Sequence, residues 1–177
     1  MITLVTGGSG SGKSEFAENK ACSYKSENLI YIATMMAYDE ESLKKIERHK
    51  NMRKDKNFKT IECAVNLSSV NLPKKSTVLI DCMSNLVANE MYSKDGSKEN
   101  AVSSIIKGIE ALKSSSLNLV IVTNEVFSDG VEYSKETEEY IKNLGNINEY
   151  LGKIANEVVE VVYSIPIYHK KEGEHVN

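Results

Sequence analysis

The feature that most constrains the fold is a glycine-rich loop close to the start of the chain. The segment GGSGSGKS, residues 7–14, follows the apolar run 2–6 and precedes a segment of helix-forming residues. Glycine adopts positive φ angles at little steric cost, so such a loop can turn several backbone N–H groups toward one anion. A helix that begins directly after the loop adds free N–H groups and the positive end of its dipole. The segment therefore predicts a strand, a phosphate-binding loop and a helix, in that order.

The loop matches the pattern G-x-x-x-x-G-K-[ST], whose fixed positions are Gly7, Gly12, Lys13 and Ser14. In this pattern the lysine reaches the β- and γ-phosphates of a nucleotide, and the final hydroxyl binds Mg²⁺. The alternative is a flexible glycine turn without a ligand. The flanking strand and helix favour a nucleoside triphosphate. The expected nucleotide-binding residues of the loop are Gly7, Gly8, Ser9, Gly10, Ser11, Gly12, Lys13 and Ser14.

Apolar runs that resemble buried strands recur along the chain, at residues 2–6, 29–34, 76–82, 117–125 and 158–164. They are mostly continuous rather than alternating, which is typical of parallel strands covered on both faces. Segments with helical spacing follow the glycine loop and occupy residues 39–54, 101–113 and 135–156, and we expect Asp39 to be the N-cap of the first of these ranges. This alternation predicts an α/β fold like that of P-loop NTPases, with a mainly parallel, doubly wound sheet and helices on both faces. We expect one domain over residues 1–166 and a polar C-terminal tail over 167–177.

The composition is that of an ordinary globular protein. The 177 residues include 41% hydrophobic and 27% charged side chains, with a formal net charge of −3. Such a charge gives no support for binding nucleic acid through bulk attraction to phosphate, and we expect no nucleic-acid partner. No apolar run approaches the roughly 18–20 residues of a membrane span. The cysteines Cys22, Cys63 and Cys82 are widely spaced, which indicates reduced thiols and a cytoplasmic protein.

An acidic residue ends each of two predicted strands. Phosphate-binding loops require a carboxylate at the end of a neighbouring strand to position Mg²⁺, and Asp81 in the run 76–82 suits that role. Aspartate also commonly begins a turn or caps a helix, so the metal role has a structural alternative. Glu125, at the end of the run 117–125, is a rival or additional member of the site.

A histidine lies within a run rich in basic residues. The run, residues 44–59, is first interpreted as the solvated face of a helix. His49 and Arg53 share one face of the helix predicted over 39–54, where a lone histidine is ordinarily a surface or core-edge residue. The alternative is catalytic, because a neutral imidazole can accept a phosphoryl or nucleotidyl group while Lys50 and Arg53 attract phosphate. The residues alone leave both interpretations open.

Six segments occur in the order found in one known family. They are LVTGGSGSGKSEFAE, IYIATM, KIERHKNMR, TIEC, VLIDCMSNLVANEM and VIVTNEV, and the likeness extends from residue 2 to about residue 126. A looser likeness continues over residues 145–165. With these segments the chain resembles the bifunctional adenosylcobinamide kinase / adenosylcobinamide-phosphate guanylyltransferases of cobalamin biosynthesis.

The resemblance implies a transferase that acts in two steps. ATP or GTP would first phosphorylate the aminopropanol hydroxyl of adenosylcobinamide. His49 would then attack the α-phosphate of GTP, which would give a GMP–histidine intermediate and pyrophosphate. The phosphate of the substrate would finally take GMP to give adenosylcobinamide-GDP. The resemblance also implies a homotrimer.

The resemblance assigns roles to individual residues. His49 and Lys13 would be catalytic, and Ser14 and Asp81 would bind Mg²⁺. Beyond the glycine loop, the residues expected to contact the nucleotide or its metal are Ala33, Thr34, Met35, Lys50, Asn51, Met52, Arg53, Glu62 and Asp81.

Some positions depart from the family pattern. Gly10 and Asn146 stand where arginine is common, and residues 127–143 are acidic instead of containing proline and arginine. These departures concern the corrinoid-facing surface and the subunit interface. Two other functions compete with this one, a simple P-loop small-molecule kinase and a non-catalytic nucleotide switch or assembly ATPase. Asn124 and Glu125 do not form the N-K-x-D motif with which switch GTPases read their base, which weakens the switch hypothesis.

Overall fold

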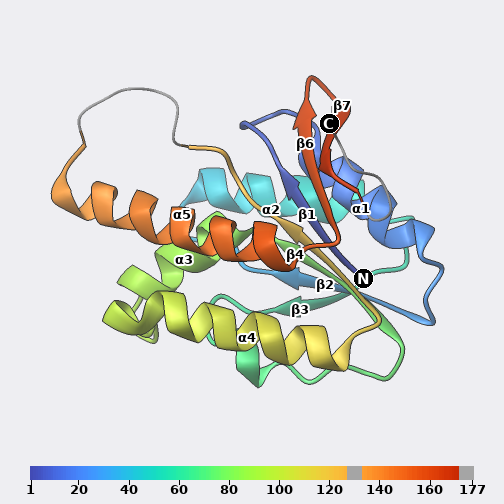
Figure 1. Cartoon of the computed structure of the whole chain (residues 1–177), viewed down its shortest axis with the longest axis horizontal. Coiled ribbons are helices and arrows are strands. Elements are labelled where there is room, and N and C mark those ends of the chain that lie inside the picture. The colour runs from blue at the N-terminus through green and yellow to red at the C-terminus, as the bar shows by residue number, and fades with distance from the viewer. Residues whose placement is uncertain (127–132, 172–177) are drawn as a thin grey trace.

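The computed structural model describes residues 1–126 and 133–171, and these form one sheet flanked by helices (Figure 1). The sheet order is β3-β2-β4-β5-β1-β6-β7. Each neighbouring pair is parallel except β6 and β7, which are antiparallel. The strands are β1 (Ile2–Thr6), β2 (Asn28–Ala33), β3 (Lys59–Glu62), β4 (Ser76–Asp81), β5 (Asn118–Val122), β6 (Glu157–Val162) and β7 (Ile165–Lys170).

The helices cover both faces of the sheet, as predicted. They are α1 (Lys13–Ser23), α2 (Glu40–Met52), α3 (Met83–Tyr92), α4 (Ala101–Ser115) and α5 (Lys135–Ile154), with short 3-10 turns η1 (Leu67–Ser69) and η2 (Lys98–Asn100). Figure 1 shows α3, α4 and α5 on one side of the sheet and α1 and α2 on the other. No helix within the described residues is long and apolar enough to cross a membrane.

Alternate residues of the parallel strands point to two separate cores. Ile30 and Ile80 belong to the larger core, which α3, α4 and α5 cover. Their neighbours Tyr31 and Leu79 face the smaller core, which includes Ala17 and Ala21 of α1. Because side chains alternate along a strand, both faces of β2 and β4 must be apolar, which explains their continuous apolar runs.

The polar tail expected from residue 167 begins inside a strand, so this boundary is wrong. Residues Ile165–Lys170 form β7, which pairs with β6. Every residue of β7 is exposed, and its few apolar residues are interrupted by a proline and followed by polar residues. Pro166, which comes just after the apolar run 158–164, lies within β7, where an edge position leaves one side of the backbone unpaired. Residues 172–177 lie outside the described part of the chain.

Helix α2 is positioned by its ends rather than by packing along its length. It has no buried residue. At its start, the Asp39 side chain accepts a hydrogen bond from the Ser42 backbone N–H at 2.7 Å, while Ser42 Oγ is 3.0 Å from the Asp39 backbone nitrogen. This reciprocal capping box satisfies backbone donors that the helix leaves free. The predicted N-cap at Asp39 is therefore confirmed.

The segment after α2 is held against α1 by a buried ion pair. Lys56 Nζ lies 2.8 Å from Oε2 of Glu18, whose side chain is 0% exposed. Phe58 follows two residues later and packs edge-on against Tyr31, with ring centroids 6.1 Å apart.

The basic run was expected to be a solvated face, and this is confirmed for Lys44, Lys45 and Lys50, which are exposed. It is wrong for Arg53, which is buried, and for Lys56, which is paired with a buried carboxylate. Arg53 stacks on Tyr31 of β2, and Lys56 contacts Glu18 of α1, so neither side chain is directed only at solvent.

Replacing Lys56 by alanine should lower the free energy of unfolding by about 3 kcal/mol, because it leaves the Glu18 carboxylate buried without its cation. The matched control is Lys75→Ala. Lys75 pairs with Glu27 on the surface, where the two side chains are 63% and 65% exposed, and we expect a loss below about 1 kcal/mol. Urea unfolding followed by circular dichroism measures both. Equal losses would show that the Glu18 pair does not anchor this segment.

Gly108 and Gly152 offer a second matched pair, because both lie inside helices. A Cβ added at Gly108 would lie 2.4 Å from Leu67 Cβ, whereas one added at Gly152 has nothing within 4 Å. Gly108→Ala should therefore destabilise the protein by about 1–3 kcal/mol through overpacking of α4 against η1. Gly152→Ala should stabilise it by up to about 1 kcal/mol through helix propensity. Thermal and urea unfolding measure the sign of the change in the free energy of unfolding for each variant. A stabilising Gly108→Ala would contradict the packing of α4 on η1.

Candidate functional site

The glycine loop connects β1 to α1 at the carboxyl end of the sheet, which is where α/β proteins bind ligands. Gly10 and Gly12 have φ angles of +72° and +91°. A Cβ at Gly12 would also lie 2.7 Å from Ser164 Oγ in the turn between β6 and β7. The Ser164 backbone N–H donates to Ser11 O at 2.8 Å, so the β6–β7 turn is hydrogen-bonded to the glycine loop.

Lys13, the first residue of α1, folds back across the loop. Its Nζ donates to the Gly8 carbonyl at 3.0 Å, and the residue is 9% exposed. Burial lowers the pKa of Lys13, although nearby Cys82 and Asp81 oppose that shift. A poorly solvated ammonium group gains free energy from an adjacent anion. The loop thus contains a cation suited to contact phosphate oxygens.

The loop and His49 line the same cavity, which has a volume of about 920 Å³. Most of the residues predicted for the site line this cavity. Some belong to the glycine loop, and the others lie on or next to β2, α2, β3 and β4. They are Ser9, Gly10, Ser11, Gly12, Lys13, Ser14, Ala33, Met35, His49, Lys50, Met52, Arg53, Glu62 and Asp81. The fold therefore brings the end of β1 together with a helix that lies some way along the chain.

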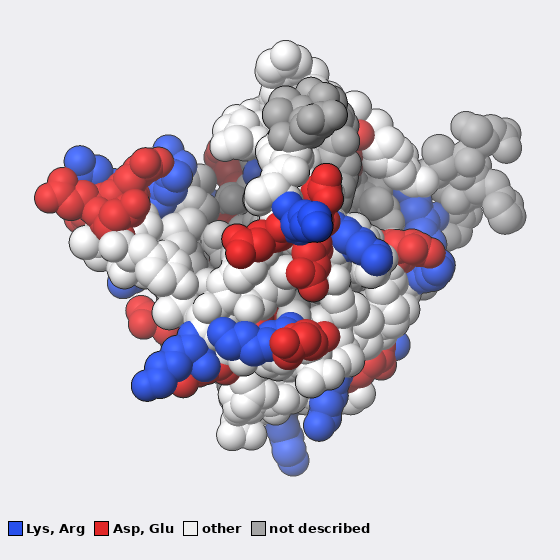
Figure 2. Space-filling model, turned by 90° about the vertical axis from the view of Figure 1, so that its left-hand side faces the viewer, with Lys and Arg blue, Asp and Glu red and all other residues white. Residues whose placement is uncertain are grey.

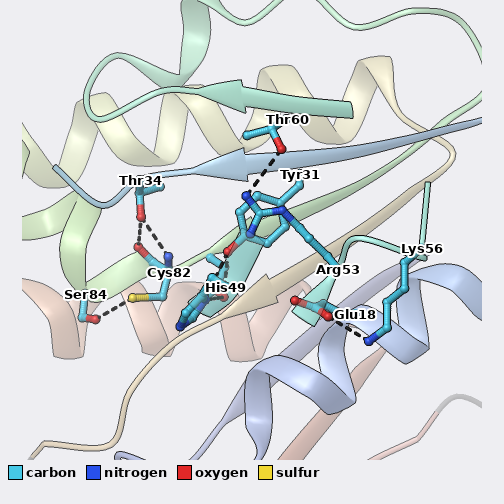
Figure 3. Close-up of polar contacts among 10 residues, drawn as sticks. Glu18, Tyr31, Thr34, His49, Arg53, Lys56, Thr60, Cys82 and Ser84 are labelled. Carbon is cyan, nitrogen blue, oxygen red and sulfur yellow. Dashed lines mark hydrogen bonds and ion pairs between the residues drawn. The ribbon is translucent and has the colours of Figure 1, made fainter. Parts of the chain in front are cut away.

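Four predicted site residues are not among the described residues that line this cavity. Gly7 and Gly8 take part through the backbone, since Gly7 O accepts from Glu125 N–H and Gly8 O accepts from Lys13. Thr34 is fully buried, and its hydroxyl accepts from Cys82 N and donates to Cys82 O, both at 2.8 Å (Figure 3). Asn51 lies on the exposed side of α2. Their expected contacts with nucleotide stay predictions.

His49 is held by the carboxylate of Asp81. His49 Nδ1 lies 3.2 Å from Asp81 Oδ2, with the two side chains 19% and 6% exposed. The Tyr31 hydroxyl donates to the same oxygen at 3.0 Å and lies 3.5 Å from His49 Nδ1. Burial, and next to it the Asp81 charge, raises the pKa of Tyr31 far above its usual value, so its hydroxyl stays a donor. The three side chains form one hydrogen-bonded group, hereafter the His49 group.

Arg53 stacks on this group. Its guanidinium carbon lies 3.8 Å from the centre of the Tyr31 ring, and Nη2 is 3.5 Å from Thr60 Oγ1 on β3 (Figure 3). A guanidinium over an aromatic face is attracted by the ring quadrupole, most strongly where water is excluded. Arg53 therefore places a fixed positive charge beside His49, at the edge of the cavity that also contains Lys50.

Sequence reasoning missed Tyr31 as a site residue. It lies in the middle of the apolar run that became β2, and its only signal was a ring with a hydroxyl among aliphatic neighbours. Asn124, considered only as part of a base-reading motif, also lines the cavity, and its Nδ2 donates to Ser84 Oγ at 2.6 Å. Residues 127–132, part of the acidic departure from the family pattern, lie outside the described residues.

Charges are mixed on the face of the molecule shown in Figure 2, where basic and acidic side chains are interspersed. The face shown is the left-hand side of the molecule as it is drawn in Figure 1. The cavity itself contains individual cations, such as Lys13, that can attract a triphosphate.

The cavity also contains oxygen donors for a divalent cation. Ser14 supplies a hydroxyl and Asp81 a carboxylate, and both are ligands of the kind that Mg²⁺ prefers. Within the described residues there is no group of three or more His, Cys, Asp or Glu side chains that could hold a metal ion by itself. Bound Mg²⁺ typically keeps several waters and shares substrate phosphates. The residues present fit an ion of that kind.

Comparison with solved structures confirms the predicted fold class. A solved ATPase domain superimposes with a TM-score of 0.54 at 14% identity, over 99% of this chain and 78% of that chain. The flagellar accessory protein FlaH from Methanocaldococcus jannaschii gives a TM-score of 0.52 at 10% identity, over 97% and 78%. These likenesses concern the fold alone.

Sequence comparison identifies the family. The chain is 32% identical to the bifunctional adenosylcobalamin biosynthesis protein CobU of Escherichia coli, over 94% of this chain and 98% of the relative. It is 30% identical to the protein of the same name from Salmonella typhimurium, with the same coverage. A family model described as cobinamide kinase / cobinamide phosphate guanyltransferase matches residues 3–168. This protein therefore belongs to the cobinamide kinase / cobinamide phosphate guanyltransferase family.

Proposed function

We propose that this protein catalyses two successive transfers in the assembly of the cobalamin nucleotide loop. It phosphorylates adenosylcobinamide with ATP or GTP, and it then transfers GMP from GTP to that phosphate, forming adenosylcobinamide-GDP and pyrophosphate. The observation that carries the proposal is the single cavity lined by both the Lys13 loop and His49. Membership of a family described by both activities supports it.

In the first transfer, the glycine loop binds the triphosphate. Its backbone N–H groups and the start of α1 face the phosphates, and Lys13 contacts the β- and γ-oxygens. Lys13 then exchanges its Gly8 carbonyl partner for phosphate. The substrate hydroxyl attacks the γ-phosphorus and releases its proton to water, the bond from that phosphorus to the bridging oxygen breaks, and the nucleoside diphosphate leaves with the electron pair.

In the second transfer, His49 divides a difficult displacement into two easier ones. An imidazole nitrogen attacks the α-phosphorus of GTP, and pyrophosphate leaves with the electron pair of the broken P–O bond. A phosphate oxygen of the acceptor then attacks the same phosphorus, and the imidazole leaves. Arg53 and Lys50 hold positive charge close to this step, where negative charge develops on the phosphoryl oxygens.

Ser14 and Asp81 would hold Mg²⁺, which when bound neutralises part of the phosphate charge. The remaining parts of the proposal rest on the family resemblance and on sequence. A homotrimer and contacts of Ala33, Met35 and Glu62 with the nucleotide stay predictions, as does a cytoplasmic location.

The decisive test uses GTP labelled at the α-phosphate. Wild-type protein with Mg²⁺ should acquire an acid-labile, alkali-stable label. In His49→Ala the labelling rate should fall by about 1,000-fold or more, because the variant lacks the nucleophile. Denaturing gels measure the label. His49→Ala should still phosphorylate cobinamide, since the Lys13 loop is intact, and Lys13→Ala should lose both reactions.

His169→Ala is the matched control, because His169 pairs with Glu160 at the β6–β7 edge, away from the cavity. It should label like the wild type. Phosphorylation of cobinamide without any label on the wild-type protein would contradict the covalent route and favour a simple P-loop kinase. Label that persists in His49→Ala would place the nucleophile elsewhere.

A further inference from the structure

The two nitrogens of the His49 ring have different surroundings. Nδ1 lies 3.2 Å from Asp81 Oδ2, and the Tyr31 hydroxyl donates to that same oxygen at 3.0 Å. Nε2 is separated from Nδ1 by the Cε1 carbon, and its lone pair or proton points in a different direction. No hydrogen bond joins Nε2 to a described residue, whereas His169 uses its Nε2 to contact Glu160. A neutral imidazole carries its proton on only one of the two nitrogens, so these contacts decide which.

The hydrogen bonds favour one tautomer. With the proton on Nδ1, His49 donates to the Tyr31 hydroxyl at 3.5 Å, Tyr31 donates to Asp81 at 3.0 Å, and the Nδ1–H also faces the carboxylate at 3.2 Å. With the proton on Nε2, the Nδ1 lone pair would face the carboxylate at 3.2 Å. Tyr31 has one O–H and could then donate to only one of the two acceptors. The first arrangement is therefore selected, because an acceptor left unpaired in a buried group is costly.

We propose that Asp81, itself oriented by Tyr31, fixes His49 as the Nδ1–H tautomer and leaves Nε2 as the nitrogen that takes the GMP group. Asp81 and Tyr31 are positioning residues in this step. The inference rests on the proposed guanylyl transfer for its chemistry, but the tautomer is a property of the protein without nucleotide.

The tautomer fits the chemistry of the transfer. The Nε2 lone pair forms the N–P bond as the bond between the α-phosphorus and the bridging oxygen breaks, and pyrophosphate leaves with that electron pair. The ring becomes positively charged and keeps its proton on Nδ1, where the Asp81 carboxylate stabilises it. When the acceptor phosphate attacks, the N–P bond breaks and its electron pair returns to Nε2. No proton has to leave Nδ1 in either half of the reaction.

The structure explains why Tyr31 is suited to this task. The Arg53 guanidinium lies over its ring, the Phe58 ring packs nearly perpendicular to it at an interplanar angle of 77°, and the residue is 3% exposed. A ring fixed in this way keeps its hydroxyl pointed at Asp81. Phe58 in turn belongs to the segment that Lys56 anchors to α1.

The test is long-range ¹H–¹⁵N NMR of metal-free, nucleotide-free protein labelled with ¹⁵N-histidine, in alkaline buffer. The His49 signals are assigned by their loss in His49→Ala. We expect the Nδ1–H pattern for wild-type His49, and a shift toward the Nε2–H pattern in Tyr31→Phe and more strongly in Asp81→Asn. His169 is the internal reference, because its Nε2 contacts Glu160 at 2.8 Å and its signals should not change in either variant.

A second measurement identifies the nitrogen that carries GMP. In protein labelled with ¹⁵N-histidine and reacted with GTP, ³¹P–¹⁵N coupling should identify Nε2 of His49. Tyr31→Phe should slow labelling about 10-fold with an unchanged Kd for GTP, the fold-change expected for one hydrogen bond near the reacting group. Tyr140→Phe is the matched control, since Tyr140 is also partly buried but donates to Ser84 O. It should label at the wild-type rate.

The outcomes separate the two proposals. An Nε2–H pattern in wild-type His49, GMP on Nδ1, or an unchanged His49 pattern in both variants would overturn the positioning role while leaving guanylyl transfer intact. Wild-type protein that shows the Nδ1–H pattern but never acquires label would overturn the proposed transfer, and with it the nucleophilic role of Nε2. If Asp81→Asn does not fold, Tyr31→Phe and the wild-type measurements decide the question.

Discussion

The hydrogen-bonded group around Asp81 is the constraint on which the site depends. Its carboxylate ends the fully buried strand β4 and contacts His49 from α2 and Tyr31 from β2. Helix α2 has no buried side chain of its own, so these polar contacts, with the Lys56–Glu18 pair, fix its position. A buried carboxylate must be matched by donors, and the donors available here are the groups of the proposed active site. Stability and function therefore share the same contacts.

The two proposed reactions need different cations in one place, and the fold supplies them from different elements. Lys13 comes from the start of α1, whereas Arg53 follows the end of α2 and lies on Tyr31. The cavity between them can hold a triphosphate near the loop or present its α-phosphate to His49. The proximity of both sets of groups gives a physical reason for two transfers in one small protein.

Much of this arrangement can be predicted from sequence, and the exceptions have physical causes. The glycine loop, the strands with continuous apolar runs and the N-cap at Asp39 are predictable because each is a local signal. Strand β7 escapes prediction because it is a short, exposed edge strand whose apolar residues are interrupted by Pro166 and followed by polar residues. Arg53 and Lys56 look solvated because a basic run normally is. Their positions depend on Tyr31 and Glu18, partners that no spacing along the chain could reveal.

The phosphate-binding loop, the alternation of strands and helices, and the family resemblance that nominates His49 all follow from the amino-acid sequence without coordinates. They rest on short-range chemistry, because glycine conformation, capping and apolar periodicity act over a few residues. Three features emerge only from the folded chain: which ring nitrogen of His49 faces Asp81, that Tyr31 joins them, and that Thr34 turns away from the cavity. These features depend on the parallel register of β2 and β4, which aligns Ala33 with Asp81 and so brings the ends of two distant segments together.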